Sequence, residues 1–134
     1  MSAPRELPGR TIAKGRAEGS VLRSSAPISF FGGVDPETGI VCEPGHPLEG
    51  RSIAGRVLCF PTGKGSTVGS YTLYRLAKRG RAPAAILNAA CETIVAVGAI
   101  IAGIPCIDQL PIEELADAAR VEVDADRGVV TVLD

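Results

Sequence analysis

The sequence has no excess of one charge, no long hydrophobic run and only one histidine. Its 134 residues carry 14 Lys plus Arg and 15 Asp plus Glu, so the formal net charge is -1. A nearly neutral chain has no electrostatic footprint for nucleic acid or an anionic membrane, and we expect neither as a partner. The most apolar window, residues 94–104, is well short of the roughly 20 residues that cross a bilayer. The start of the chain lacks a secretory signal, so we expect a cytoplasmic protein.

Signatures of a metal site or a hydrolytic triad are also missing. The four cysteines, which are Cys42, Cys59, Cys91 and Cys106, include no C-x-x-C pair, and a single histidine offers no cluster. We therefore expect this chain to bind no metal, and we interpret the cysteines as reduced thiols that fill the core. No carboxylate is evidently paired with a serine and the single histidine, which disfavours a Ser-His-Asp hydrolase.

Length and composition predict one compact domain. Hydrophobic residues make up 46% of the chain, and a chain of this size buries enough surface to fold without disulfides. The 16 Gly and 10 Pro residues predict many tight turns between short elements. We expect residues 1–10 to form a loosely ordered lead-in and residues 11–134 to form a single domain.

Hydrophobic patterning predicts short strands that alternate with helices. Apolar runs bounded by turn residues indicate strands at residues 57–60, 84–87 and 104–107, strand-like stretches over residues 11–24 broken by Gly15 and Gly19, and a hairpin over residues 121–132. Helical spacing indicates helices at residues 66–79 and 112–119, while residues 93–102 are compatible with a helix or a strand. The order predicts a layered α/β domain with a mixed sheet or partial barrel and flanking helices.

Two segments rich in glycine and proline are expected to form shaped loops. Residues 27–39 run from an apolar strand end into a Gly-Gly pair and an Asp-Pro-x-x-Gly turn, and residues 40–51 are expected to cover one end of the domain. Gly32 and Gly33 serve either the turn itself or the close approach of a substrate to the main chain.

Charged and titratable residues in these loops have a structural and a functional interpretation. His46 lies between prolines and is interpreted as a loop anchor in preference to a phosphocarrier or ligand-binding residue. Asp35 and Glu37 are interpreted as turn formers in preference to a catalytic carboxylate pair.

The strongest candidate site is the Gly-Lys-Gly-Ser turn at residues 63–66, between an apolar strand and a helix. Unpaired N–H groups at a helix start favour an anion, and Lys64 adds a positive charge. The turn is not a nucleotide P-loop, because Leu58 stands where that pattern needs Gly and Gly65 where it needs Ser or Thr. Ser66 is interpreted as a helix N-cap or as a catalytic or anion-binding residue, and the two roles are compatible.

Five segments resemble the small, swivel-domain subunit of the aconitase X-type dehydratases. They are residues 15–19, 27–39, 63–71, 82–86 and 92–99. The resemblance extends from about residue 11 to the C-terminal hairpin, and its most specific parts are residues 27–39 and the Gly-Lys-Gly-Ser run. It implies a swivelling β/β/α domain that docks on a large subunit, and that this large subunit carries an iron–sulfur cluster, expected to be 4Fe–4S.

The same resemblance implies an activity and a set of site residues. The most similar branch of the family removes water from (R)-5-phosphomevalonate and gives trans-anhydromevalonate 5-phosphate, in a modified, archaeal-type mevalonate route to isoprenoids. The family's proton acceptor is the Ser after Gly-Lys-Gly, here Ser66, and iron on the partner acts as a Lewis acid. From the glycine-rich loops themselves, apart from the resemblance, we expect substrate-binding contacts from Gly63, Lys64, Gly65, Thr67, Gly32 and Gly33.

Two alternatives remain open from the sequence. Relatives with the same fold and chemistry dehydrate cis-3-hydroxy-L-proline, although Lys64 and residues 67–71 look more like the phosphomevalonate branch. An alternative of another class is a non-catalytic anion-binding module in which Ser66 only caps a helix. In the dehydratase interpretation the isolated chain is inactive, and one of its faces exposes a patch for the partner.

Overall fold

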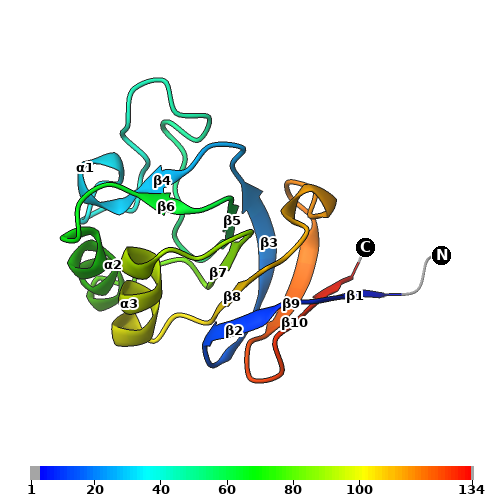
Figure 1. Cartoon of the computed structure of the whole chain (residues 1–134). Helices are drawn as coiled ribbons and strands as arrows, with labels where there is room; N and C mark the ends of the chain where they lie inside the picture. Colours follow the sequence, from blue (N-terminus) through cyan, green and yellow to red (C-terminus); the bar gives the residue numbers. More distant parts are fainter. Residues whose placement is uncertain (1–3, 134) are drawn as a thin grey trace.

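An eight-stranded mixed sheet is the frame of the computed structural model, which describes residues 4–133 (Figure 1). In spatial order the strands are β1 (Arg5–Pro8), β10 (Val129–Val132), β9 (Arg120–Asp124), β3 (Arg16–Arg23), β5 (Val57–Phe60), β7 (Ala85–Asn88), β8 (Cys106–Asp108) and β2 (Arg10–Ala13). The four strands β3, β5, β7 and β8 are parallel, and all other pairs in this sheet are antiparallel. The predicted mixed sheet is confirmed.

The two edges of this sheet are joined by one residue. Strands β1 and β2 lie at opposite ends of the spatial order, yet only Gly9 separates them along the chain. The Gly9 N–H donates to the carbonyl of Gly128 at 2.8 Å. A Cβ at Gly9 would lie 2.5 Å from the Asp108 carbonyl oxygen, so this position accommodates only glycine. The short link curls the sheet into a partial barrel.

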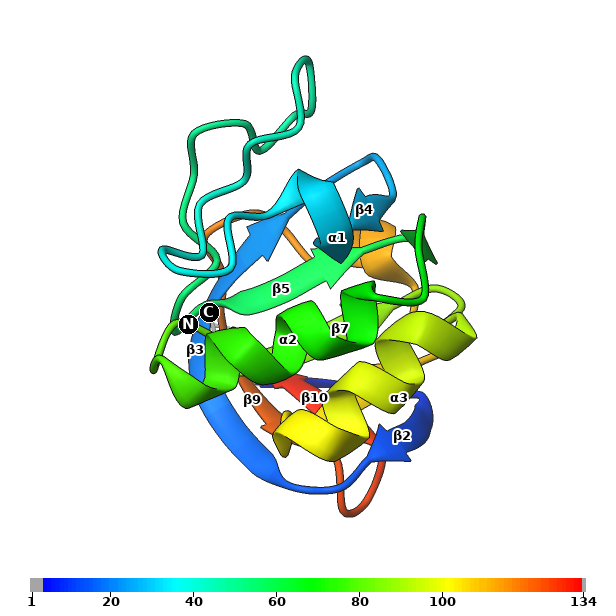
Figure 2. The ribbon, with the colours of Figure 1, turned by 90° about the vertical axis from the view of Figure 1, so that its left-hand side faces the viewer.

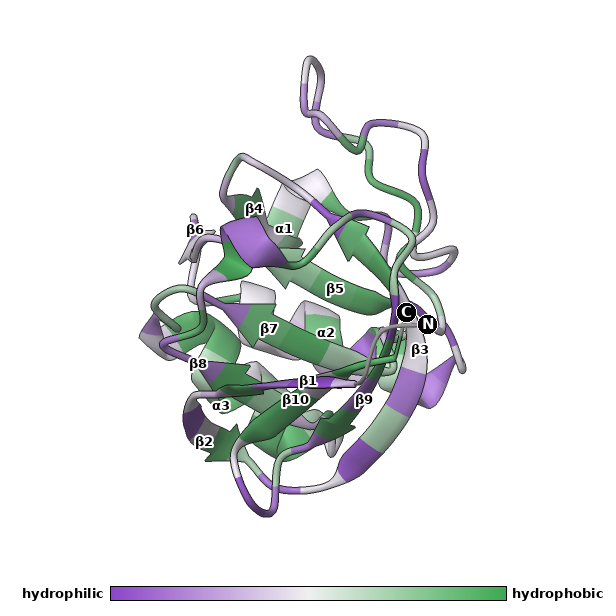
Figure 3. Cartoon of the chain, turned by 90° about the vertical axis from the view of Figure 1, so that its right-hand side faces the viewer, coloured by the Kyte–Doolittle hydropathy of each residue, from purple (hydrophilic) through white to green (hydrophobic). Residues whose placement is uncertain are grey.

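Two hydrophobic cores lie on the two faces of the parallel strands. Along β5, Val57 and Cys59 face the core enclosed by the curled sheet, whereas Leu58 and Phe60 face the helices. Strands buried on both faces are apolar along their length, unlike strands with one solvated face. Figure 3 shows this contrast between β5 and the mixed colouring of β3 and β9. The layers are therefore β, β and α, which confirms the predicted class.

Helices α2 (Gly69–Lys78) and α3 (Thr93–Ala102) cover one side of the sheet (Figure 2). They pack closely because Gly98 has no side chain: a Cβ there would lie only 3.2 Å from the Cα of Ser70. Helix α3 confirms the helical interpretation of residues 93–102, and Glu92 caps it by accepting the N–H groups of Ile94 and Val95 at 3.0 and 2.9 Å. No helix within residues 4–133 is long and apolar enough to cross a membrane.

The helix predicted over residues 112–119 is wrong. Only the short 3-10 turn η1 (Ile112–Glu114) forms there. The residues that follow form backbone hydrogen bonds with strand β3 in place of helical ones. The Ala118 N–H donates to the Val21 carbonyl, and the Val21 N–H donates to the Ala119 carbonyl, both at 2.8 Å. The Asp117 carboxylate also accepts the Arg23 N–H at 2.9 Å. These long-range bonds compete successfully with a weak local helical preference.

Several predicted boundaries at the start of the chain are corrected. Residues 5–8 are not a loose lead-in, because β1 pairs antiparallel with β10 and buries Leu7 against the sheet core. Residues 1–3 lie outside the described residues. Gly15 does separate two strands, with φ at 134°, whereas Gly19 pairs with Val121 inside β3 and does not break it. The C-terminal hairpin of β9 and β10 is confirmed.

A long loop rises above the sheet between α1 (Phe30–Gly33) and β5 (Figure 2). The Asp35 carboxylate accepts the N–H of Glu37 at 2.8 Å, so its interpretation as a turn former is confirmed. His46 is buried and anchors the loop: its Nδ1 accepts the Leu48 N–H, which leaves Nε2–H to donate to the Pro27 carbonyl, both at 3.0 Å.

Candidate functional site

The candidate site lies beyond the carboxyl ends of the parallel strands. Because β3, β5, β7 and β8 run in the same direction, the segments that leave them meet at one edge of the sheet, where ligands of α/β proteins commonly bind. The chain leaving β3 forms β4 (Ile28–Ser29), and the chain leaving β5 forms β6 (Gly63–Lys64); these two short strands pair in parallel. Their pairing places the Gly-Lys-Gly-Ser turn beside residues 28–33.

Ser66 is exposed and stands one turn ahead of α2. Its Oγ accepts the Val68 N–H at 3.1 Å, and its carbonyl accepts the Gly69 N–H at 2.9 Å. Helix α2 itself begins at Gly69 and has no side-chain cap, so the predicted helix start at residue 66 and the N-cap interpretation of Ser66 are wrong. Ser66 is therefore accessible to a ligand, and its hydroxyl already accepts one backbone hydrogen bond. The N–H of the next residue, Thr67, has no acceptor within residues 4–133.

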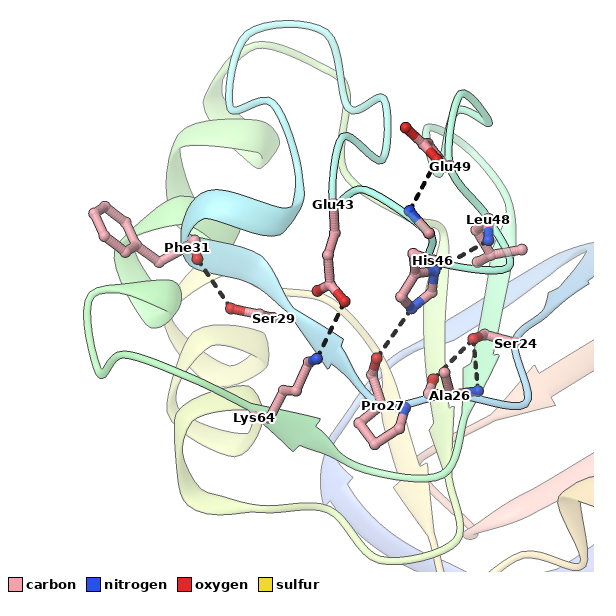
Figure 4. Close-up of polar contacts among 11 residues, drawn as sticks. Ser24, Ala26, Pro27, Ser29, Phe31, Glu43, His46, Leu48, Glu49 and Lys64 are labelled. Carbon is pink, nitrogen blue, oxygen red and sulfur yellow. Dashed lines mark hydrogen bonds and ion pairs between the residues drawn. The ribbon is translucent and has the colours of Figure 1, made fainter.

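Lys64 carries the positive charge of the turn. It lies in β6 opposite Ser29 of β4, and its Nζ is 3.1 Å from Oε2 of Glu43 (Figure 4). Both side chains are partly accessible to solvent. The ammonium group is thus paired with a carboxylate from the long loop.

The structure brings Gly33 and Gly65 together around the side chain of Ser29. A Cβ at Gly33 would lie 3.5 Å from the Cβ of Ser29, and a Cβ at Gly65 would collide with the Ser29 hydroxyl. Gly65 also has φ at 94°, in the left-handed region. The Ser29 hydroxyl donates to the Phe31 carbonyl at 2.9 Å. Gly65 is therefore required by close packing and by its backbone conformation, whereas a side chain at Gly33 would make only ordinary contacts with Ser29 and Glu43.

The remaining predicted site residues surround the same turn. Gly63 is buried against the cap of α3, because a Cβ there would lie 2.6 Å from Oε1 of Glu92. Thr67 is exposed. Gly32 is also exposed, has φ at 85°, and lines a groove of about 460 Å³ between α1 and α2. A second hollow of about 420 Å³ lies between α2 and α3 and is lined by Thr67.

Ser29 and Glu43 were missed by the sequence analysis. Ser29 lies directly before the Phe-Phe-Gly-Gly run that carries much of the family resemblance, and that position is the signal that could have identified it. Glu43 lies in an irregular loop, 21 residues before Lys64, and no spacing pattern connects the two. Their proximity depends on the pairing of β4 with β6 and on the path of the loop.

The helices next to the site expose an apolar surface, which we call the helical face. Seven of the eight large hydrophobic side chains exposed within residues 4–133 belong to it: Phe31, Val68, Tyr71, Tyr74, Val97, Ile100 and Ile101. Helix α3 carries no charged residue along its length. Val68 and Tyr71 connect this face to the Ser66 turn.

The described residues do not fit an iron–sulfur cluster or another metal site. Within residues 4–133, no three His, Cys, Asp or Glu side chains come together. Cys59 and Cys106 are buried as expected, but Cys42 is exposed, which corrects its interpretation as a core residue. Cys91 is half-buried, and its N–H donates to the Asp108 carboxylate, which in turn pairs with Arg10, each at 2.9 Å.

The environments of the cysteines predict two reactive and two inert thiols in the isolated chain. A hydrogen bond with the Cys106 thiol lowers the pKa of Cys91, whereas this bond and burial raise the pKa of Cys106, and burial raises the pKa of Cys59 to about 12. Because the thiolate is the nucleophile, iodoacetamide is expected to modify Cys42 and Cys91 in the folded chain. Modification of Cys91 should begin at a lower pH than that of an ordinary thiol.

Peptide mass spectrometry after timed alkylation measures this pattern. A sample unfolded in urea is the control, in which all four cysteines should react. Modification of Cys59 in the folded chain at the rate of Cys42 would contradict the burial of Cys59.

Comparison with known proteins finds relatives along nearly the whole chain. The family model described as aconitase X swivel domain matches residues 6–132. The phosphomevalonate dehydratase small subunit of Thermococcus gammatolerans is 54% identical over 129 residues, covering 96% of this chain and 98% of that protein. The protein of the same name from Methanosarcina acetivorans is 55% identical over 133 residues, covering 97% of this chain and 92% of that protein. The crystal structure of Thermococcus kodakaraensis aconitase X in its holo-form matches with a TM-score of 0.95 and 52% identity, covering 97% of this chain and 99% of that chain.

Proposed function

The chain belongs to the aconitase X swivel-domain family, and on this basis we propose that it is the small subunit of a dehydratase that removes water from (R)-5-phosphomevalonate. The similarity to phosphomevalonate dehydratase small subunits, which extends over 96% of this chain, carries the proposal. A fold shared at a TM-score of 0.95 with an aconitase X supports it. The product is then trans-anhydromevalonate 5-phosphate.

Ser66 is the proton acceptor in this proposal. Its alkoxide takes the proton from C2, next to the substrate carboxylate, and the electron pair of the broken C–H bond forms the C2=C3 double bond. The C3–O bond breaks, and the leaving hydroxide takes up a proton from solvent and departs as water. Ser66 then gives the proton from C2 to solvent and returns to its alkoxide form. The exposure of Ser66 supports this role, since a buried hydroxyl would not reach a substrate.

A serine hydroxyl becomes a base only where its alkoxide is stabilised. The Val68 N–H already donates to Ser66 Oγ at 3.1 Å, and such a bond favours the charged form of the oxygen. The N–H of Thr67 and the ammonium group of Lys64 are further donors at the same turn, and we assign to them the oxyanions of the substrate. Gly32 and Gly33 are assigned to the wall of the substrate site.

We assign the iron–sulfur cluster to the large subunit, because the described residues of this chain bring no set of ligands together. When bound, such a cluster supplies Lewis-acid chemistry for the loss of a hydroxyl group. The site is then shared by two polypeptides, and the isolated small subunit is inactive.

The helical face is the surface that we assign to the large subunit. An exposed apolar patch of this kind marks an interaction site in a soluble protein. The face continues from the Ser66 turn through Val68 and Tyr71, so a subunit seated on it would reach the proposed site. Relatives of this chain are named small subunits, which supports a larger chain as the occupant.

Reconstitution of the complex tests the proposed function. The chain is expressed with its large subunit under anaerobic conditions, and both (R)-5-phosphomevalonate and cis-3-hydroxy-L-proline are offered to the purified pair. We expect turnover of phosphomevalonate by the pair and none by either subunit alone. If the pair turns over hydroxyproline only, phosphomevalonate is not the substrate, but the chain is still the small subunit of a dehydratase. Absence of a co-purifying large subunit and of turnover would favour the anion-binding module.

A further inference from the structure

Glu43 is paired with one predicted site residue, Lys64, and lies close to a second, Gly33. Its Oε2 lies 3.1 Å from Lys64 Nζ (Figure 4). A Cβ built on Gly33 would lie 3.4 Å from its Oε1. The neighbouring Cys42 N–H donates to the Gly33 carbonyl at 2.9 Å, which fixes the backbone beside Glu43. The carboxylate is therefore held in place between β6 and the end of α1.

Lys64 depends on this carboxylate for its position. Within residues 4–133, Glu43 is the side chain that pairs with Lys64, and the lysine side chain is 48% exposed. An exposed ion pair adds little to the stability of a fold. The lysine side chain is long and flexible, however, and the conformational entropy lost when a ligand orders it lowers the affinity for that ligand by roughly 10-fold or more. If a carboxylate already orders the lysine side chain before the ligand binds, most of this loss of affinity is avoided.

We propose that Glu43 is a positioning residue that holds the Lys64 ammonium group at the Gly-Lys-Gly-Ser turn, ready for an anionic oxygen of the substrate. The proposal rests on the proposed function, because it requires substrate at this turn. Glu43 also repels an anion, but this repulsion is weak in a solvent-accessible site with screening salt. The gain from a preorganised cation is therefore the larger effect.

The test is a double-mutant cycle on the assembled complex. Glu43→Gln keeps the size of the side chain and removes its charge, so the packing against Gly33 is retained. We expect it to raise KM about 10-fold with kcat changed less than about 2-fold, because the contact is made in the ground state and the transition state alike. Glu43→Asp keeps the charge and is expected to give an intermediate KM. In a Lys64→Gln background, Glu43→Gln is expected to change KM less than about 2-fold.

Glu18→Gln is the matched control. Glu18 is also exposed and ion-paired, with Arg120 at 3.0 Å, but it lies on β3 away from the turn. Its substitution should leave KM unchanged. With an active wild-type complex, two results would overturn the role of Glu43. One is an unchanged KM in Glu43→Gln, and the other is a rise of KM on Glu43→Gln that is as large in the Lys64→Gln background as in the wild type. Absence of phosphomevalonate turnover by the wild-type complex would instead contradict the proposed function.

Discussion

Replacing Ser66 by Ala in the assembled complex is expected to lower kcat by about 1,000-fold, within the range of about 10²–10⁴ that a positioned general base contributes. KM should change little, because the backbone donors at the turn and Lys64 are retained. The fold should also be retained. The substitution removes one hydrogen bond, from Val68 N–H to Ser66 Oγ, and such a bond stabilises a protein by about 0.5–1.5 kcal/mol.

Ser52 provides a matched control for this experiment. It is exposed, and its Oγ accepts the N–H two residues later, from Ala54 at 3.2 Å, as Ser66 Oγ does from Val68. Ser52→Ala therefore loses the same kind of local bond outside the proposed site, and its complex should turn over at the wild-type rate. Both variants should unfold at similar urea concentrations. If the Ser66→Ala complex keeps near-wild-type turnover, Ser66 is not the proton acceptor.

Local signals were sufficient to predict the centre of the fold. The strand at residues 57–60 is apolar at every position because it is buried on both faces, and this run is visible in the sequence. The end of the following helix is likewise predicted, because a glycine after basic residues commonly ends a helix. In the structure the helix ends at Lys78, and Gly80 adopts φ of 68°. The start of that helix was misplaced because Ser66 resembles a cap, whereas its hydroxyl bonds within a separate turn.

Features that depend on distant parts of the chain were not predictable in this way. Residues 112–119 have helical spacing, but bonds to Val21 and Arg23 on β3 hold them in another conformation. Strand β1 is specified by its pairing with β10, at the other end of the chain. The same reason explains why the turn at Ser66 was found and Glu43 was not: the turn is contiguous in sequence, whereas the carboxylate reaches Lys64 through a loop.

Replacing Ile100 by Glu is expected to weaken the association of the two subunits by at least about 30-fold, which corresponds to about 2 kcal/mol. Ile100 is 60% exposed on α3, so the substitution should not unfold the isolated chain. If the large subunit covers this position, the new carboxylate loses its hydration without gaining a partner, and a buried unpaired charge is costly. Titration of the large subunit with labelled small-subunit variants measures the dissociation constant.

Ile40 distinguishes the loss of a contact from a general effect of added charge. It is also a large exposed hydrophobic residue, at 40%, but it lies in the long loop and not on the helical face. Ile40→Glu should bind the large subunit with the affinity of the wild type. Val97→Glu, on the same helix as Ile100, should weaken binding as Ile100→Glu does. If all three variants bind the large subunit with wild-type affinity, the large subunit docks elsewhere. The apolar surface beside the Ser66 turn would then need another occupant.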